Sequence, residues 1–323
     1  MYPIHLVSIV IPLYNEEKNI RLLAEEIITV MKKAPYTYEI IFVNDGSSDN
    51  SWDEITELSG LFPNIRGIDL AGNYGQTIAL RSGFDSANGD VIVAMDADMQ
   101  HNPVYIPQFL SYIEEGYDMV GGWKEKRPEN FFKSFLANAA HKAICKISGV
   151  NMKYFGATFK VYRKYLLENV NMIGDAHRYI GALVAKKGTR VKEIPINIRD
   201  RHAGKSNYKL TKALFVIVDL VFLKFYVSYI NRPFRLFGIP GIILFVIGFI
   251  STLVFSIGSL FLKWYIEKDY QTEFQTSIFL MLFGALLISL GLIAQIGIFN
   301  YFTNKKQEPY NVRQQTKKWI FHA

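Results

Sequence analysis

The stretch GDVIVAMDADMQHNP, residues 89–103, changes character within a few positions. Its apolar run, residues 91–95, is typical of a buried strand. The run ends in two carboxylates, Asp96 and Asp98, with Gln100 two residues further on. On an extended segment, side chains at positions i and i+2 point to the same side. The stretch therefore predicts a strand whose end presents three oxygen-bearing side chains on one side.

Strand-like and helix-like segments alternate around this stretch. The β-rich runs LVSIVIPLYN, YEIIFVND and IRGIDLAGN are separated by segments with helical spacing, as in EEKNIRLLAEEIITVMKKA. Strands that alternate with helices predict a mainly parallel sheet covered by helices on both faces. Ligands of such sheets bind outside the carboxyl ends of the strands. The first 205 residues are therefore expected to form an α/β domain with its site at that edge.

Acidic residues follow two other predicted strands. Asp45 ends the run YEIIFVND and is followed by a tight Gly46–Ser47 turn, while Pro12, Tyr14 and Glu16 come just past the first strand. Any one acid alone could be a helix cap. Three acid-bearing strand ends in one sheet predict a common site.

Asp96 and Asp98 are the expected ligands of a divalent cation. Two hard oxygen ligands at the carboxyl end of a strand suit Mg²⁺ or Mn²⁺ shared with substrate phosphates. Gln100 can add a carbonyl oxygen. A cation beside a nucleotide diphosphate makes that group a better leaving group. The alternative is a solvated acidic loop.

A basic loop, RDRHAGKSNYK, precedes the first long apolar segment. Its Arg201 and Ser206 can contact the other side of a diphosphate. The alternative is a basic patch beside the membrane that binds anionic headgroups.

Two segments are long enough to cross a bilayer. Residues 236–262 and 278–302 carry no charge, and each exceeds the roughly 20 residues that a transmembrane helix needs. The basic flank NRPFR and the basic tail predict that the α/β domain and the tail both lie in the cytosol. The expected organisation along the chain is a catalytic domain at 1–205, an interfacial amphipathic helix at 206–232, two transmembrane helices within 233–303 and a cytosolic tail at 304–323.

The segment 209–230 has two interpretations. It is long and apolar but contains Lys212, Asp219 and Lys224. Because a charge at mid-bilayer is costly, we favour an amphipathic helix at the membrane interface. The alternative is a third span, which would move the tail to the other face.

Composition favours a membrane partner over nucleic acid. The 323-residue chain has a formal net charge of +7, and its basic residues cluster beside the apolar segments. Cys145 is the single cysteine, which excludes a disulfide framework and favours a reducing compartment. The oligomeric state is open, and a homo-oligomer is compatible with these features.

The motifs VSIVIPLYNEEKNI, VNDGSSDNS, NYGQTIALRSGF, MDADMQHNP and RHAGKSNY occur in the order found in family 2 glycosyltransferases of the GT-A fold. The chain resembles most closely the polyprenyl-phosphate glycosyltransferases, which include dolichol-phosphate mannose synthases, bactoprenol glucosyltransferases and undecaprenyl-phosphate formyl-aminoarabinose transferases. The resemblance covers nearly the whole chain, including the two expected membrane spans. As a set the motifs are highly specific, whereas the DxD alone is weak.

The resemblance implies roles for the motif residues. Pro12, Tyr14, Glu16 and Asp45 would hold the nucleobase and ribose of a uridine diphospho-sugar. Asp96, Asp98 and Gln100 would surround the metal and diphosphate. Arg201 and Ser206 would close on the phosphates, and Asp175, with His177 and Arg178, would face the acceptor or the sugar. The implied catalytic residues are Asp98, Asp175 and Arg201; the alternative for Asp175 is a helix N-cap.

Two positions depart from the family pattern. Tyr154 stands where members often carry an acidic residue, which puts a general base there in doubt, and Asn207 replaces a common lysine. A phosphate monoester acceptor is already largely a dianion at neutral pH, so its binding needs cations more than its attack needs a base. The candidate cations are Arg127, Lys133, Lys142, Arg163 and Arg178.

The expected function is metal-dependent, inverting transfer of one sugar from a nucleotide diphosphate to a polyprenyl phosphate at the cytosolic leaflet. Three alternatives stay open. A processive polysaccharide synthase shares the sheet and the DxD, and a nucleotidyltransferase could use the same acids but has little need for membrane spans. A membrane scaffold that senses nucleotides would not need the full set of acids.

Overall fold

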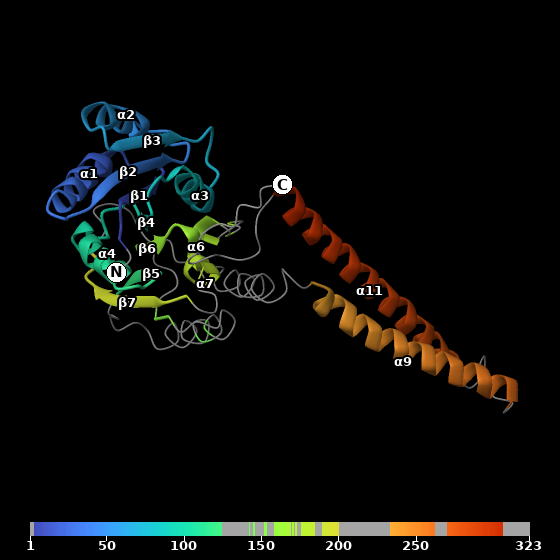
Figure 1. The fold of residues 1–323 in the computed structure, drawn as a ribbon. Coiled ribbons are helices and arrows are strands. Elements are labelled where there is room, and N and C mark those ends of the chain that lie inside the picture. Colours follow the sequence, from blue (N-terminus) through green and yellow to red (C-terminus); the bar gives the residue numbers. More distant parts are fainter. Residues whose placement is uncertain are drawn as a thin grey trace, which may run out of the picture. The chain divides into compact units, whose positions relative to one another are not determined.

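The computed structural model describes residues 3–124, 142, 145, 152–153, 158–168, 170, 172, 176–184, 189–199, 233–261 and 270–305. The chain divides into two compact units. One contains the strands and the shorter helices, and the other contains two long helices (Figure 1).

The described residues of the first unit form a seven-stranded sheet in the order β3-β2-β1-β4-β6-β5-β7. Its strands are β1 (Leu6–Leu13), β2 (Thr37–Asn44), β3 (Ile65–Asp69), β4 (Val91–Ala94), β5 (Met119–Lys124), β6 (Lys160–Arg163) and β7 (Val191–Ile196). Only β6, among these, runs against its neighbours, because it pairs antiparallel with both β4 and β5. The expected mainly parallel sheet is confirmed, with one reversed strand that the alternation of elements did not predict.

Helices cover both faces of this sheet. The longer ones are α1 (Glu17–Met31), α2 (Ser51–Leu61), α3 (Gln76–Ser86) and α4 (Ile106–Glu114); the short ones are η1 (Pro103–Tyr105), α6 (Tyr165–Glu168), η2 (Ala176–Tyr179) and α7 (Ile180–Val184). Buried side chains of α1, α2 and α4 form one core with Ile9 and Ile11 of β1. α3 packs on the opposite face, where a Cβ added at Gly83 would lie 2.3 Å from Cγ1 of Val10. The glycine lets α3 approach the strand closely.

The order of the strands reverses beside β1. The chain lays β2 and β3 on one side of β1 and then crosses to the other side to form β4. Pro12 lies inside β1 rather than just past it, which corrects the expected strand boundary. The pairing of β4 with β1 ends at Ala94, opposite Val10 and two residues before Pro12. The N–H that proline lacks is therefore not needed for a hydrogen bond to β4.

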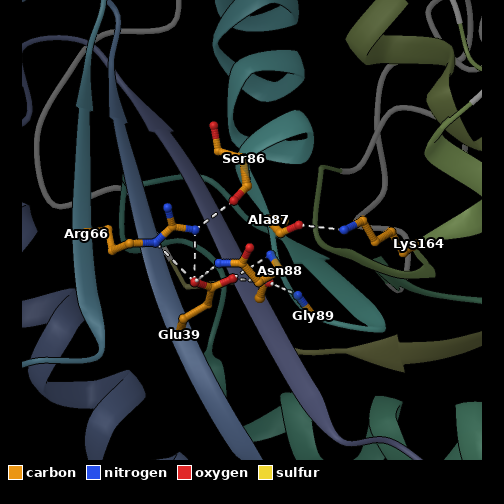
Figure 2. Close-up of polar contacts among 8 residues, drawn as sticks. Glu39, Arg66, Ser86, Ala87, Asn88, Gly89 and Lys164 are labelled. Atoms are coloured by element: carbon orange, nitrogen blue, oxygen red, sulfur yellow. Dashed lines mark hydrogen bonds and ion pairs between the residues drawn. The ribbon is translucent and has the colours of Figure 1, made fainter.

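A buried acid joins four segments at the amino-terminal edge of the sheet (Figure 2). Glu39 is 8% exposed and accepts a hydrogen bond from the Ser8 hydroxyl at 2.6 Å. It also accepts from the backbone N–H of Asn88 at 2.8 Å and from Nε of Arg66 at 3.0 Å. Burial alone would raise the pKa of Glu39, but these hydrogen bonds and the charge of Arg66 outweigh it, so the pKa is lowered.

Replacing Glu39 with glutamine is expected to cost about 2 kcal/mol of unfolding free energy at neutral pH, because the amide nitrogen would face the Arg66 guanidinium. A folded-state pKa below the unfolded one contributes stability above the unfolded pKa, and this contribution is lost as pH falls through the folded pKa. The difference between wild type and Glu39→Gln should therefore shrink below about pH 4.5. Thermal unfolding of the full chain in detergent against pH tests this. The control is Glu57→Gln, which removes an exposed partner of Arg21 and should leave the midpoint unchanged.

In its described residues, the second unit is a pair of apolar helices, α9 (Pro233–Phe261) and α11 (Gln271–Lys305). Both are long and apolar enough to cross a membrane, as the sequence predicts. They pack through glycines: a Cβ at Gly284 would lie 2.6 Å from the carbonyl oxygen of Gly241. Thr252 and Ser277 also share a hydrogen bond of 2.9 Å between the helices. The expected interfacial helix at 206–232 and the tail beyond residue 305 lie outside the described residues.

Candidate active site

Three neighbouring strands end at the same edge of the sheet. β2, β1 and β4 are adjacent and parallel, so the residues that follow them converge, as predicted. The loops after β1 and β2 are joined to each other. The Asn15 N–H donates to the Ser47 hydroxyl at 2.8 Å, and the Ser48 N–H donates to the Asn15 side-chain oxygen at 2.8 Å. Asn15 has a φ of 57°, a left-handed conformation that asparagine tolerates better than most residues.

The residues after β4 keep the alternation that the sequence predicts. Met95, Ala97 and Met99 are buried. Asp96, Asp98 and Gln100, at the alternate positions, are each half-buried. The strand itself ends at Ala94, and the turn that follows is held by the Gln100 N–H, which donates to Asp98 Oδ1 at 3.1 Å. The three expected ligands therefore lie in one turn beyond the strand end.

The carboxylate of Asp96 is oriented by its neighbours. Nε2 of Gln76 donates to Asp96 Oδ1 at 2.7 Å, and the side chain of Thr158 forms a further hydrogen bond with the carboxylate. Burial is the main reason that the pKa of Asp96 is raised, and the carboxylate of Asp98 adds to the rise. The hydrogen bonds and His101 oppose this shift. Without a cation, the protein thus disfavours negative charge at this carboxylate.

His101 lies beside the second oxygen of this carboxylate. It is 7% exposed, and its ring stacks on Phe159 with 5.2 Å between centroids. Its Nδ1 is 3.8 Å from Asp96 Oδ2 and has no hydrogen-bond partner within the described part of the chain. Burial lowers the pKa of His101 and favours the neutral ring, although Asp96 and Asp98 pull the other way. Buried polar atoms of this kind usually meet an ordered water or an ion.

Lys160 places a buried amine near the same carboxylate. It opens β6, paired with Ala94 at the end of β4, and is 1% exposed. The aliphatic part of the Lys160 side chain packs against two glycines. A Cβ added at Gly121 or Gly181 would lie 3.3–3.4 Å from one of its carbons. Burial lowers the pKa of Lys160 to about 8, while Glu193 and Asp96 oppose the shift. Lys160 therefore remains mostly protonated at neutral pH.

These residues fit a divalent cation. Two carboxylates and an amide oxygen form a hard donor set that leaves room for substrate phosphates. The raised pKa of Asp96 and the unpartnered Nδ1 of His101 are consistent with a positive species there. Within the described ranges, no three His, Cys, Asp or Glu side chains form a metal-binding group by themselves. The site would thus depend on Gln100 and on the substrate for further ligands.

The acid after β2 has a structural role in addition to any contact with substrate. Asp45 is 4% exposed, and its two oxygens accept the backbone N–H groups of Tyr74 and Gly75, each at 2.8 Å. It anchors the loop that leads into α3. A contact between Asp45 and a nucleotide stays a prediction.

The residues expected to bind the nucleotide around β1 lie near this edge. Pro12 is buried in the strand, whereas Tyr14 is 47% exposed. Glu16 precedes α1 and accepts a hydrogen bond from the Asn19 side chain at 2.5 Å. The exposed ring of Tyr14 is available to contact a ligand.

The expected acceptor-side residues are only partly described. The backbone N–H of His177 and its Nδ1 both contact the Thr77 hydroxyl, at 3.2 and 2.8 Å. Asp175, Arg201 and Ser206 lie outside the described residues, as do Tyr154, Asn207, Arg127 and Lys133 and the side chain of Arg178.

Arg163 is corrected as a candidate phosphate ligand. Because β6 is antiparallel to β4, Arg163 pairs with Val91 at the edge opposite Asp96. Its guanidinium donates instead to the Ile113 carbonyl at 2.8 Å. Lys142 is exposed.

Five residues of the site were not predicted from sequence: Gln76, Thr77, His101, Thr158 and Lys160. A sequence signal existed for three of them, because Gln76 and Thr77 lie in NYGQTIALRSGF and His101 lies in MDADMQHNP. Lys160 left a weaker signal, a single lysine within the apolar run TFKVY.

Comparison with known proteins agrees with this architecture. Residues 8–170 match the profile described as Glycosyl transferase family 2. The chain is 30% identical to dodecaprenyl-phosphate galacturonate synthase from Rhizobium johnstonii, over 95% of this chain and 92% of that protein. It is 31% identical to undecaprenyl-phosphate 4-deoxy-4-formamido-L-arabinose transferase from Proteus mirabilis, over 90% and 88%.

A solved structure supports the fold. Glucosyl-3-phosphoglycerate synthase from Mycobacterium tuberculosis, in complex with Mn²⁺, UDP-glucose and phosphoglyceric acid, superimposes with a TM-score of 0.52 at 18% identity, covering 68% of this chain and 80% of that one. Together with the profile match, this confirms the expected GT-A fold.

Proposed function

Because this chain belongs to glycosyltransferase family 2, we propose that it transfers one sugar from a nucleoside diphosphate to a polyprenyl phosphate at a membrane surface. One observation carries the proposal: similarity to two polyprenyl-phosphate transferases extends over at least 90% of the chain. Matches of that extent run beyond the α/β unit into the apolar helices α9 and α11. A lipid acceptor accounts for that pairing of a sugar-nucleotide fold with membrane helices.

The donor and the topology are finer parts of the proposal. A uridine diphospho-sugar is the expected donor, with Pro12, Tyr14, Glu16 and Asp45 around the nucleoside. Arg201 and Ser206 are proposed to contact the diphosphate, and Asp175 the acceptor or the sugar. The catalytic unit is proposed to lie on the cytosolic side of the plasma membrane, with both long helices crossing it. A homo-oligomer is compatible with this arrangement.

The reaction is a displacement at the anomeric carbon. An oxygen of the polyprenyl phosphate forms a bond to that carbon, and the bond from the carbon to the diphosphate oxygen breaks. The diphosphate leaves with the electron pair, so an α-linked donor gives a β-linked lipid product. A phosphate monoester has a second pKa of about 6, so the attacking oxygen needs no proton removed at neutral pH.

On the donor side of the site, the described residues orient a carboxylate and place a positive charge near it. Gln76 and Thr158 fix the Asp96 carboxylate, and Lys160 supplies a buried positive charge close to it. Mg²⁺ or Mn²⁺ bound by Asp96, Asp98 and Gln100 would stabilise negative charge on the departing diphosphate.

A donor screen against undecaprenyl phosphate tests the proposal. We expect metal-dependent release of nucleoside diphosphate only when the lipid is present, and mass spectrometry should find one added sugar on the lipid. Growth of a polymer would instead favour a processive synthase. Failure with every donor would favour the nucleotide-sensing scaffold. EDTA should abolish release, and added Mg²⁺ or Mn²⁺ should restore it.

A further inference from the structure

Four consecutive residues, Tyr74–Thr77, contact three distant parts of the candidate site. The N–H groups of Tyr74 and Gly75 bind the carboxylate of Asp45. The next residue, Gln76, donates to Asp96 at 2.7 Å. Thr77 then contacts His177, 100 positions away in the chain. One short segment therefore links the end of β2, the end of β4 and η2.

The segment is held on a rigid support. Gly75 has a φ of 88°, a conformation that favours glycine, and it immediately precedes α3. Gln76 and Thr77 form the first turn of this helix, which packs closely on β1 through Gly83. Side chains on a packed helix hold their partners more precisely than side chains on loops.

Gln76 holds one oxygen of the Asp96 carboxylate. Its amide occupies Oδ1, while Oδ2 faces Nδ1 of His101 at 3.8 Å. An outer hydrogen bond of this kind orients a carboxylate ligand toward a cation, and its loss typically costs 10–100-fold in metal affinity. Gln76 is thus placed to orient Asp96.

Thr77 controls the ring of His177. Thr77 is 3% exposed, and its hydroxyl oxygen accepts the backbone N–H of His177 at 3.2 Å. The hydroxyl hydrogen can then be donated to Nδ1, which lies 2.8 Å away. The two contacts hold the imidazole ring of His177 in one orientation, and a hydroxyl that donates to Nδ1 selects the tautomer with its proton on Nε2.

We propose that Tyr74–Thr77 is a positioning segment that keeps the donor and acceptor sides of the site in a fixed arrangement. In this segment, Gln76 orients Asp96 and Thr77 orients His177. The inference rests on the proposed function, because the family resemblance places His177 beside Asp175, the residue proposed to contact the acceptor or the sugar. It predicts that two adjacent substitutions act on different steps. Loss of Gln76 weakens cation binding, whereas loss of Thr77 weakens use of the lipid acceptor.

The test combines Mn²⁺ binding with kinetics. Electron paramagnetic resonance of Mn²⁺ added to the full chain with UDP should give about tenfold weaker affinity for Gln76→Leu and an unchanged affinity for Thr77→Val. With the donor found in the screen, Thr77→Val should lower kcat/KM for undecaprenyl phosphate about tenfold. Thr77→Ser, which keeps the hydroxyl, should restore it.

Matched controls are Gln108→Leu and Thr56→Val, which make the same changes at exposed positions of α4 and α2; both should behave as wild type. Wild-type Mn²⁺ affinity in Gln76→Leu would overturn the inference. An equal loss of Mn²⁺ affinity in Gln76→Leu and Thr77→Val would also overturn it, because it would indicate general damage to α3. If the wild type itself neither binds Mn²⁺ nor transfers sugar, the proposed function fails first, and the two failures are thereby distinguished.

Discussion

Replacing Asp98 with alanine is expected to lower the rate of sugar transfer by about 10³-fold or more. A cation that stabilises a leaving diphosphate contributes several kcal/mol to the transition state, and each 1.36 kcal/mol corresponds to a tenfold change in rate. Asp98 is one of two carboxylates after β4 and holds its turn through the Gln100 N–H. The measurement is release of nucleoside diphosphate in the presence of undecaprenyl phosphate.

Membrane insertion of Asp98→Ala should be intact, because α9 and α11 form a separate unit. Asp98→Asn tests the charge of the side chain without changing its shape. It keeps one side-chain oxygen but should lose most of the activity as well. Asp53→Ala, an exposed acid in the first turn of α2, is the control and should retain the wild-type rate. Normal turnover in Asp98→Ala would refute the assignment of this residue to the metal site.

Replacing Gly284 with leucine is expected to separate the two long helices. A Cβ at this position would lie 2.5 Å from the backbone nitrogen of Phe245 and 2.6 Å from the carbonyl oxygen of Gly241. Backbone atoms cannot move aside as a flexible side chain can, so α9 and α11 must move apart. Small residues at a helix interface allow such close packing in membranes, and overpacking typically costs about 1–3 kcal/mol or more.

The neighbouring Thr252–Ser277 contact provides a readout. With both residues replaced by cysteine and Cys145 replaced by alanine, oxidation should cross-link the helices. Gly284→Leu should lower the yield about tenfold. Gly297→Leu is the matched control on the same helix, because a Cβ there meets no atom within 4 Å. Equal cross-linking in the two leucine variants would contradict glycine-mediated packing.

Local periodicity was enough to predict much of the architecture. The alternation of residues 95–100 recurs in their burial, although the chain bends at residues 97–99 and Met99 has a φ of 61°, so an extended backbone does not account for it there. The two uncharged segments predicted α9 and α11, since length and apolarity are properties of the segment alone. The parallel strand ends followed from the alternation of strands and helices.

Contacts between distant segments were decided only by the tertiary structure. The reversed direction of β6 brings Lys160 to Asp96 and takes Arg163 to the opposite edge; neither residue carries a local signal of its strand's direction. Thr77 contacts His177, which lies 100 positions away in the chain. Asp45 accepts a hydrogen bond from the backbone of the loop before α3. Sequence patterns identified which side chains could do chemistry at the sheet edge, but their partners depend on strand order and close packing, which no local periodicity encodes.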